Sequence, residues 1–580
     1  MLRAVLIPSF FLLGVFPTVG AKADQQTILD LKQLQIPGLT KSAIGVTRRG
    51  TPIVSLLSDA DFDLKTPKTR ILLVGGLDGS PKSVSAVVKA LESFYVGETA
   101  GSWRKQFAIS AVPCANPDGT AAESGSANGS GGTPALGYPP QAVAYNDPHN
   151  PESIYLWRWI GMHAPDLVVD VRTGNSLRWY ASDSLAASFE PQIEEVPTDG
   201  LVRQLRIAAP CETGTIEALQ VETADRFLPE LLAGLKNSSF AGPSLARQEL
   251  QRRLDRTPLQ VAEQLSEHYG HDLDQVVYIP ALALIGRLRL GELTGNPGHT
   301  RDVERIAAPY FRGDKPSDPR SGSGLSGHLV FCELAQQTQG DQSRRYLDLA
   351  RSAADLGFDK EGNPRTAMPF HLEMSDSVFM GGPILARVGR LTGQPRYLEA
   401  CFRHIQFMRE LVLRDDGIYR HSPLDETAWG RGNGFPALGL AMCLSDFPDD
   451  HPKRQLLLSA YRDHMEALVK HQDPTGAWHQ VIDREESYRE LTSTCMITFA
   501  MARGVDKGWL PRPRFQPVID KAWYAIRTRV PPNGRLVDVC TGTGKQKNLR
   551  EYYDRAAILG PDARGGAMAL MVATELARQD

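Results

Sequence analysis

The segment 415–435 reads DDGIYRHSPLDETAWGRGNGF and gathers side chains that bind and orient polar ligands. Trp429 offers an aromatic face for a sugar ring, and Arg431 can pair with a carboxylate through two hydrogen bonds. His421 and Asn433 supply further hydrogen bonds. The alternative interpretation is a surface loop followed by a capped helix. Taken together, these groups suit an acidic sugar as ligand.

Asp376 is a candidate general acid. It precedes a strongly apolar segment, SVFMGGPILARVG, which predicts a buried helix. An acid at the start of a helix is also favoured by the helix dipole alone, which is the structural alternative. On the inner wall of a helical ring, burial would favour the protonated carboxyl and suit it to act as a general acid.

Two kinds of turn recur after about residue 258, where the sequence is almost wholly helical. The first kind leads into a new helix at Gly295, Gly340 and Gly393, and the second leads into a polar, aromatic loop at Gly362, Gly417, Gly476 and Gly534. Spacings of 45 to 59 residues, with two helices per unit, are typical of stacked helical hairpins. About six such units fit and would close into a ring. The polar loops would then share one end, where we expect the site.

The first half alternates short apolar runs with helical stretches. The runs at 71–74, 107–113 and 167–171 each end in a cluster of Gly, Asp or Asn. This pattern predicts a largely parallel, mixed sheet covered by helices on both faces. We therefore predict a multidomain chain, with an α/β domain over 24–230, a linker over 231–258 and an all-α six-hairpin toroid over 259–580.

The N-terminus has the pattern of a secretory signal peptide over residues 1–23. Arg3 precedes the apolar run AVLIPSFFLLGVF, and Ala21-Lys22-Ala23 has the small residues of a cleavage site. An uncleaved membrane anchor is the alternative, although the apolar run is short for one. We expect a secreted or periplasmic protein with no membrane span after cleavage.

The overall charge argues against a polyanionic partner. Lys and Arg number 64 and Asp and Glu number 67, so we expect no binding to nucleic acid or to an anionic membrane surface. The seven cysteines are scattered without a CxxC pair. We therefore expect neither a disulfide framework nor a zinc knuckle, and interpret most cysteines as small buried residues.

The first half resembles the zinc carboxypeptidases and related deacylases. The resemblance rests on NPDG at 116–119 and on the run PESIYLWRWIGMHAPDLVVDVRTG. Where that family has its His, Glu and His zinc ligands, this chain has Asp78, Pro81 and Arg172. A catalytic zinc needs three protein ligands, so we expect a metal-free descendant without a cofactor. Its role as a sugar-binding, docking or supporting domain stays open.

The second half resembles the unsaturated uronyl and rhamnogalacturonyl hydrolases of glycoside hydrolase families 88 and 105. The motifs WGRGNGF, YRELTST and DSVFMGGPILARVG follow one another in the order of that family, from about residue 250 to the C-terminus. The resemblance implies a six-hairpin α/α barrel. It also implies hydration of the double bond in a 4,5-unsaturated uronic acid at the end of an acidic oligosaccharide, followed by release of that sugar.

Site residues follow from the same resemblance. Asp376 would be the acid/base, and the pocket for the unsaturated uronate would contain His421, Trp429 and Arg431. Asn433 and Phe435 would support this substrate pocket. Glu490, in the YRELTST turn, would cap or brace helices.

Two departures from the family pattern leave alternatives open. A second inner Asp is replaced by Ser or Gly in GSGLSGHLVF, unless Asp318 takes its place, and Met374-Ser375 stands where relatives have Trp. A missing second acid would impair the positioning of water. A non-catalytic protein that binds acidic glycans is therefore the second hypothesis, and a working metallocarboxypeptidase or deacylase is the third.

Overall fold

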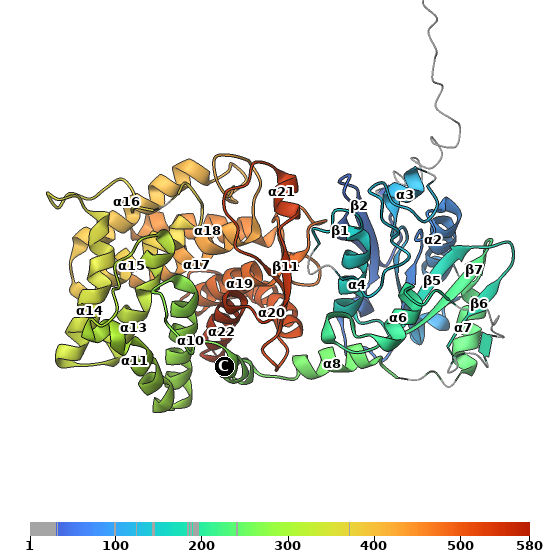
Figure 1. Cartoon of the computed structure of the whole chain (residues 1–580), viewed down its shortest axis with the longest axis horizontal. Helices are drawn as coiled ribbons and strands as arrows, with labels where there is room; N and C mark the ends of the chain where they lie inside the picture. The colour runs from blue at the N-terminus through green and yellow to red at the C-terminus, as the bar shows by residue number, and fades with distance from the viewer. Residues whose placement is uncertain are drawn as a thin grey trace, which may run out of the picture.

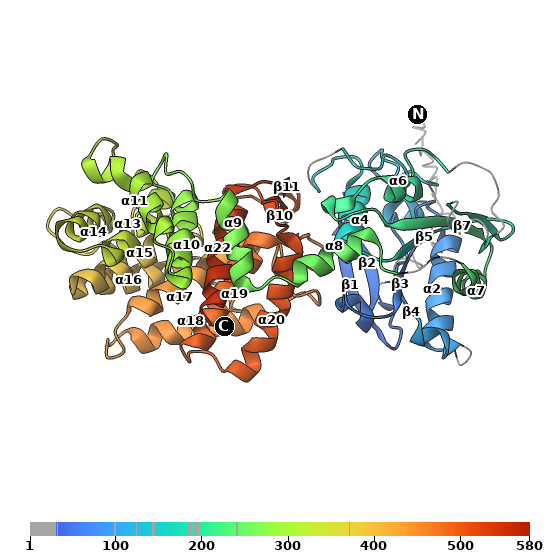
Figure 2. The same cartoon turned by 90° about the horizontal axis from the view of Figure 1, so that it is seen from below.

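The computed structural model describes residues 31–579 except 32, 98–99, 123, 142–144, 183–184, 186–187, 190–195, 239, 241 and 371. The predicted signal peptide lies outside the described residues. The chain forms two halves that lie side by side, an α/β half and a helical half (Figures 1 and 2). Among the described residues, no helix combines the length and the apolar character needed to cross a membrane.

A mixed sheet of seven strands, as far as the chain is described, forms the centre of the α/β half in the order β1-β2-β4-β3-β5-β7-β6. The strands are β1 (Leu39–Val46), β2 (Pro52–Ser58), β3 (Thr69–Val74), β4 (Phe107–Val112), β5 (Leu167–Thr173), β6 (Arg178–Tyr180) and β7 (Glu217–Thr223). Strands β4, β3, β5 and β7 are mutually parallel, whereas β1, β2 and β6 pair antiparallel. The predicted mixed sheet and its three central strands are confirmed.

Helices cover both faces of this sheet. They are α2 (Pro81–Tyr95), α4 (Pro151–His163), α6 (Leu201–Ile207) and α7 (Leu228–Asn237), with a short α3 (Pro117–Ala121) after β4. Successive residues of β3 point to opposite faces, so Ile71 and Leu73 pack with α2 and α7, while Leu72 and Val74 pack with α4 and α6. The continuous apolar runs of the sequence reflect this burial on both faces.

The predicted linker contains helical structure. Most of α7 and all of α8 (Leu245–Leu254) fall within 231–258. Both helices have apolar faces that join the cores of the α/β half. The predicted domain boundaries themselves stay a prediction.

The helical half is a closed ring of hairpins. Its inner helices, as far as the chain is described, are α10 (Tyr278–Thr294), α13 (Leu329–Gln337), α15 (Ser377–Thr392), α17 (Gly430–Asp446), α19 (Leu491–Asp506) and α22 (Ala563–Ala577). Its outer helices are α9 (Pro258–His268), α11 (Pro297–Arg312), α14 (Gly340–Ala354), α16 (Pro395–Val412), α18 (Arg454–Val469) and α20 (Arg512–Arg529). Helix α22 packs against α10, which closes the ring. The predicted six-hairpin toroid is confirmed.

The two kinds of turn fall at opposite ends of the ring, as predicted. Gly295, Gly340 and Gly393 lie where an inner helix passes to an outer one. The polar loops, which contain the four glycines from Gly362 to Gly534, lead from an outer helix to the next inner one. Two of these loops contain a small antiparallel pair of strands. The first pair is β8 (Trp478–His479) with β9 (Arg489–Glu490). The second is β10 (Leu536–Cys540) with β11 (Ala557–Gly560), and the short helix α21 (Leu549–Tyr553) lies between these two strands in the sequence.

The α/β half packs against the polar end of the ring. The Tyr145 ring stacks between Tyr155 of α4, at 4.3 Å, and Tyr488 of the helical half, at 4.9 Å. Arg158 of α4 makes a buried ion pair of 2.8 Å with Asp538 of β10, and the Tyr145 hydroxyl donates to the same carboxylate. One apolar core therefore spans both halves.

The three positions that differ from the zinc carboxypeptidases lie at the ends of the neighbouring strands β3 and β5. Asp78 accepts hydrogen bonds from Ser83 Oγ and from the Thr173 amide, and Pro81 begins α2. Arg172 pairs with Asp170, whose pKa burial raises. Among the described residues no group of three or more His, Cys, Asp or Glu side chains could hold a metal ion. The carboxypeptidase-like origin of this half stays a prediction.

All seven cysteines are buried and free. The interpretation of most of them as small buried residues is confirmed.

Burial of the Glu152 carboxyl in α4 should make the stability of the protein depend on pH. Its side chain is buried, one carboxylate oxygen accepts from Asn128 Nδ2, and burial raises its pKa from 4.5 to about 7. The folded state therefore disfavours the charged form, so stability falls as the pH rises from 4.5 to 7. We expect Glu152→Gln to stabilise the protein by up to about 3 kcal/mol at pH 8 and to have little effect at pH 4.

Urea unfolding at the two pH values measures this effect. Glu230→Gln, at an exposed site on α7, is the matched control and should change stability at neither pH. Equal effects of Glu152→Gln at both pH values would contradict the raised pKa.

Candidate active site

Asp376 and His421 form the centre of the candidate site at the polar end of the ring. Asp376 is the N-cap residue of α15, and its carboxylate caps no backbone amide. Its Oδ2 lies 3.2 Å from His421 Nε2. The Asp376 side chain is 12% exposed and that of His421 is fully buried. The acid is therefore desolvated yet still open to the solvent side.

His421 is oriented from behind by a residue that the sequence analysis did not single out. The Tyr552 hydroxyl lies 2.9 Å from His421 Nδ1, which fixes the ring so that Nε2 faces Asp376. Tyr552 belongs to the segment Tyr552-Tyr553-Asp554, and this pair of tyrosines was the signal available in the sequence. The Trp429 ring packs at 4.5 Å from the His421 ring.

Arg431 holds the neighbouring β10 in place. Its guanidinium donates to the carbonyls of Cys540 and Thr541, and its carbon Cζ lies 4.8 Å from the centre of the Trp429 ring. The side chain is only 2% exposed. Its Nε hydrogen is the group left without a partner in the described structure.

Asn433 and Phe435 lie two and four residues after Arg431 along α17. The Asn433 amide accepts from the Tyr419 amide and donates to the carbonyls of Tyr419 and Trp429. Phe435 stacks on Phe379 inside the ring. Both side chains are buried, so the structure gives them a supporting position, and direct contact with a substrate stays a prediction.

Glu490 braces two elements, as predicted. It caps α19 by accepting hydrogen bonds from the amides of Thr492 and Ser493. The same carboxylate accepts from the Cys540 amide of β10. Arg431 binds the carbonyl of Cys540 and Glu490 binds its amide, so both backbone polar groups of this β10 residue are held by side chains of the site.

Several buried polar atoms of the site have no hydrogen-bond partner in the described structure. These atoms are Ser375 Oγ, Trp429 Nε1 and Arg431 Nε, whereas Asp376 Oδ2 and His421 Nε2 have only the 3.2 Å ion pair with each other. Buried polar groups are nearly always paired in native proteins, so a cluster of free ones indicates a place where a polar ligand completes the bonding. Ser375 had no signal in the sequence beyond its place next to Asp376.

The loop before Asp376 has an unusual backbone. Phe370, Leu372 and Glu373 have φ values of 65°, 53° and 57°, in the left-handed region that side chains rarely adopt. Such strain concentrates at functional sites. An ion pair of 3.4 Å between Glu373 and Lys545 ties this loop to the segment after β10.

No second carboxylate makes a hydrogen bond or ion pair with Asp376 or His421 among the described residues. Gly322 and Ser326 lie on α12 (Gly322–Gly327), close to Met380 of α15. Asp318 is exposed and lines a separate cavity of about 410 Å³. The departure noted in the sequence therefore persists in the structure.

Gly430 is required for the approach of α17 to the neighbouring loop. A Cβ at this position would lie 2.4 Å from the carbonyl oxygen of His479, which is a backbone atom that cannot swing away. We expect Gly430→Ala to cost about 3 kcal/mol in stability and to displace Trp429 and Arg431. Thermal unfolding of the variant measures the loss. Gly544→Ala, where a Cβ would meet no atom within 4 Å, is the control; equal stability of the two variants would contradict this prediction.

Comparison with known proteins finds a matching family for the helical half. The family model described as "Glycosyl Hydrolase Family 88" matches residues 251–579. An unsaturated 3S-rhamnoglycuronyl hydrolase of Alteromonas sp. (strain LOR) is 27% identical over 201 residues, covering 31% of this chain and 49% of the relative. The unsaturated rhamnogalacturonyl hydrolase YesR of Bacillus subtilis (strain 168) is 30% identical over 187 residues, covering 31% of this chain and 52% of the relative.

A family 105 glycoside hydrolase of C. acetobutylicum ATCC 824 is a similar solved structure. It has a TM-score of 0.47 at 18% identity and covers 54% of this chain and 98% of that chain. In the sequence alignments, this chain spans about half the length of the curated relatives.

Proposed function

Because the chain belongs to glycosyl hydrolase family 88, we propose that it releases a 4,5-unsaturated uronic acid from the end of lyase-generated acidic oligosaccharides. The observation that carries the proposal is the cluster of unpartnered buried polar atoms around Asp376 and His421. The substrate supplies what this cluster lacks, since a uronate presents a carboxylate, hydroxyl groups and a ring face. We propose further that the protein acts after export, as its N-terminal sequence predicts.

The reaction follows from the position of Asp376 beside His421. The Asp376 carboxyl donates a proton to carbon 4 of the enol-ether double bond, and water adds its hydroxyl to carbon 5 while returning a proton to the carboxylate. The product is a hemiketal, which opens and releases the rest of the oligosaccharide. Atoms balance with one water consumed, and this hydration differs from the two-carboxylate displacement of ordinary glycosidases.

The other residues of the site orient the reacting groups. His421 holds the Asp376 carboxylate at 3.2 Å and is itself held by Tyr552. Trp429 lies beside His421, and its Nε1 hydrogen is free to donate to the sugar. Arg431 places a buried positive charge next to the Trp429 ring, which favours a carboxylate-bearing sugar.

Turnover of a panel of lyase-treated acidic polysaccharides tests this function. The double bond absorbs ultraviolet light, so hydration is followed as a loss of absorbance. Loss with at least one oligosaccharide supports the proposal.

The alternative function is binding of acidic glycans without turnover, and one observation favours it. No second carboxylate makes an ion pair or hydrogen bond with Asp376 or His421 in the part of the chain that the structure describes. Saturable binding of the same oligosaccharides with unchanged absorbance would select this alternative.

A further inference from the structure

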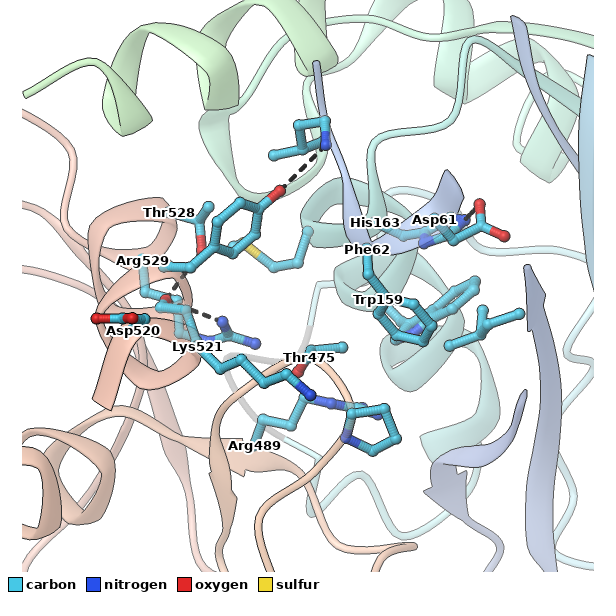
Figure 3. A pocket seen from close by; sticks show the side chains of 16 residues that line it. Asp61, Phe62, Trp159, His163, Thr475, Arg489, Asp520, Lys521, Thr528 and Arg529 are labelled. Atoms are coloured by element: carbon cyan, nitrogen blue, oxygen red, sulfur yellow. Dashed lines mark hydrogen bonds and ion pairs between the residues drawn. The ribbon is translucent and has the colours of Figure 1, made fainter. Parts of the chain in front are cut away.

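A second cavity lies between the two halves of the chain. Its volume is about 320 Å³, which is within the usual range of small-molecule sites. The α/β half contributes Phe62, Trp159 and His163 to its wall, and helix α20 contributes Lys521 and Arg529 (Figure 3). None of these residues belongs to the candidate active site.

Arg529 is the unusual residue of this cavity. Its side chain is only 5% exposed, yet no carboxylate lies within ion-pair distance of it among the described residues. One guanidinium nitrogen donates to the Ala525 carbonyl at 3.1 Å, and Nε has no partner. A buried charge without a counter-ion is costly, and burial lowers the pKa of Arg529.

The nearby buried carboxylates are already neutralised by other cations. Three buried pairs account for them: Asp61 with Arg70, Asp473 with Arg489, and Asp538 with Arg158. His163 adds a further contact to Asp61, at 3.3 Å. The positive charge of Arg529 is therefore in excess on this side of the interface.

The rim and the opposite wall define the rest of the site. Lys521 is exposed and reaches into the same space as Arg529, and the exposed carboxylate of Asp520 lies at the rim (Figure 3). Across from them, the Trp159 ring stacks on His163 at 4.4 Å and stands beside Phe62. One side of the cavity is thus cationic and the other is flat and aromatic.

We propose that this interdomain cavity binds a small carboxylate built on a six-membered ring, with the carboxylate on Arg529 and Lys521 and the ring against Trp159 and Phe62. Two kinds of molecule share this chemistry, a sugar acid and an aromatic acid. The ligand contacts both halves of the chain, so its binding stabilises their association.

Isothermal titration of the full chain tests the site with four probes. Galacturonate represents the sugar acids, 4-hydroxybenzoate the aromatic acids, galactose the ring without charge and inorganic phosphate the charge without a ring. We expect saturable binding of one or both carboxylates and a rise in the thermal unfolding midpoint. No binding of either carboxylate, or equal binding of phosphate, overturns the proposal.

Variants assign the binding to this cavity. Arg529→Gln should weaken it about tenfold or more, and Lys521→Gln, at an exposed position that cannot disturb the core, should weaken it to a smaller extent. Arg512→Gln, which is exposed at the start of the same helix, is the matched control and should bind like the wild type. Unchanged binding in both Arg529→Gln and Lys521→Gln overturns the assignment.

The test is independent of the proposed hydrolase function. Asp376→Asn should retain binding of the ring carboxylate at this cavity, because Asp376 does not line it. Loss of binding in that variant would place the ligand in the candidate active site instead and would overturn the second site.

Discussion

Asp376→Asn is expected to lower kcat/KM for unsaturated uronyl oligosaccharides about 10²- to 10⁴-fold. An asparagine keeps the shape of the side chain and its place at 3.2 Å from His421 but cannot donate a proton to the double bond. The initial rate of absorbance loss measures the effect. Because the Asp376 carboxylate caps no backbone amide of α15, the thermal unfolding midpoint should change little.

Asp415→Asn is the matched control for this experiment. Asp415 is exposed at the start of the polar segment 415–435, and its substitution should leave the rate unchanged. Wild-type kinetics in the Asp376 variant would remove that residue from the chemistry. Saturable binding with no loss of absorbance in the wild type would favour the glycan-binding alternative.

Asp538→Asn is expected to destabilise the protein by about 3–5 kcal/mol. The substitution leaves the buried Arg158 without its carboxylate partner and weakens the hydrogen bond from the Tyr145 hydroxyl. The cost is large because a charge buried without a counter-ion loses its hydration and gains nothing in return. Urea unfolding followed by tryptophan fluorescence measures the change.

Asp554→Asn provides the comparison with a more exposed interdomain pair. Asp554 pairs with Arg48 of the α/β half and with Arg550, and its side chain is 29% exposed. Solvent screening reduces the value of such pairs, so we expect a loss of about 1 kcal/mol or less. Similar losses in the Asp538 and Asp554 variants would mean that the two halves do not depend on the buried pair.

The helical ring was predictable from the sequence because each hairpin repeats the same physical requirement. An inner helix must be apolar nearly all round, and the turns between helices need glycine with positive φ. The four glycines of the polar loops have φ values of 73° to 96°. Their spacing therefore revealed both the repeat and the end of the ring on which the polar loops lie.

The outer strands of the sheet in the α/β half were not predictable in the same way. The central strands β3, β4 and β5 are buried on both faces and read as continuous apolar runs. By contrast, the edge strand β1 begins with exposed or half-exposed residues, and β7, which lies next to the edge strand β6, mixes half-exposed with buried positions. Such a short mixed pattern does not distinguish a strand from a loop until its neighbour in the sheet is known.

The sequence by itself predicted the ring and the polar segment around His421, because these depend on local periodicity and on side-chain chemistry, and the family resemblance added Asp376 as the candidate acid. Tertiary structure alone decided which of these side chains have free polar atoms, since hydrogen bonds between distant residues cannot be read from spacing. It showed that the Arg431 guanidinium donates hydrogen bonds to the backbone of β10 and that Tyr552 orients His421. It also brought Arg529 against the α/β half without a counter-ion, because the balance of buried charge depends on how the two halves pack.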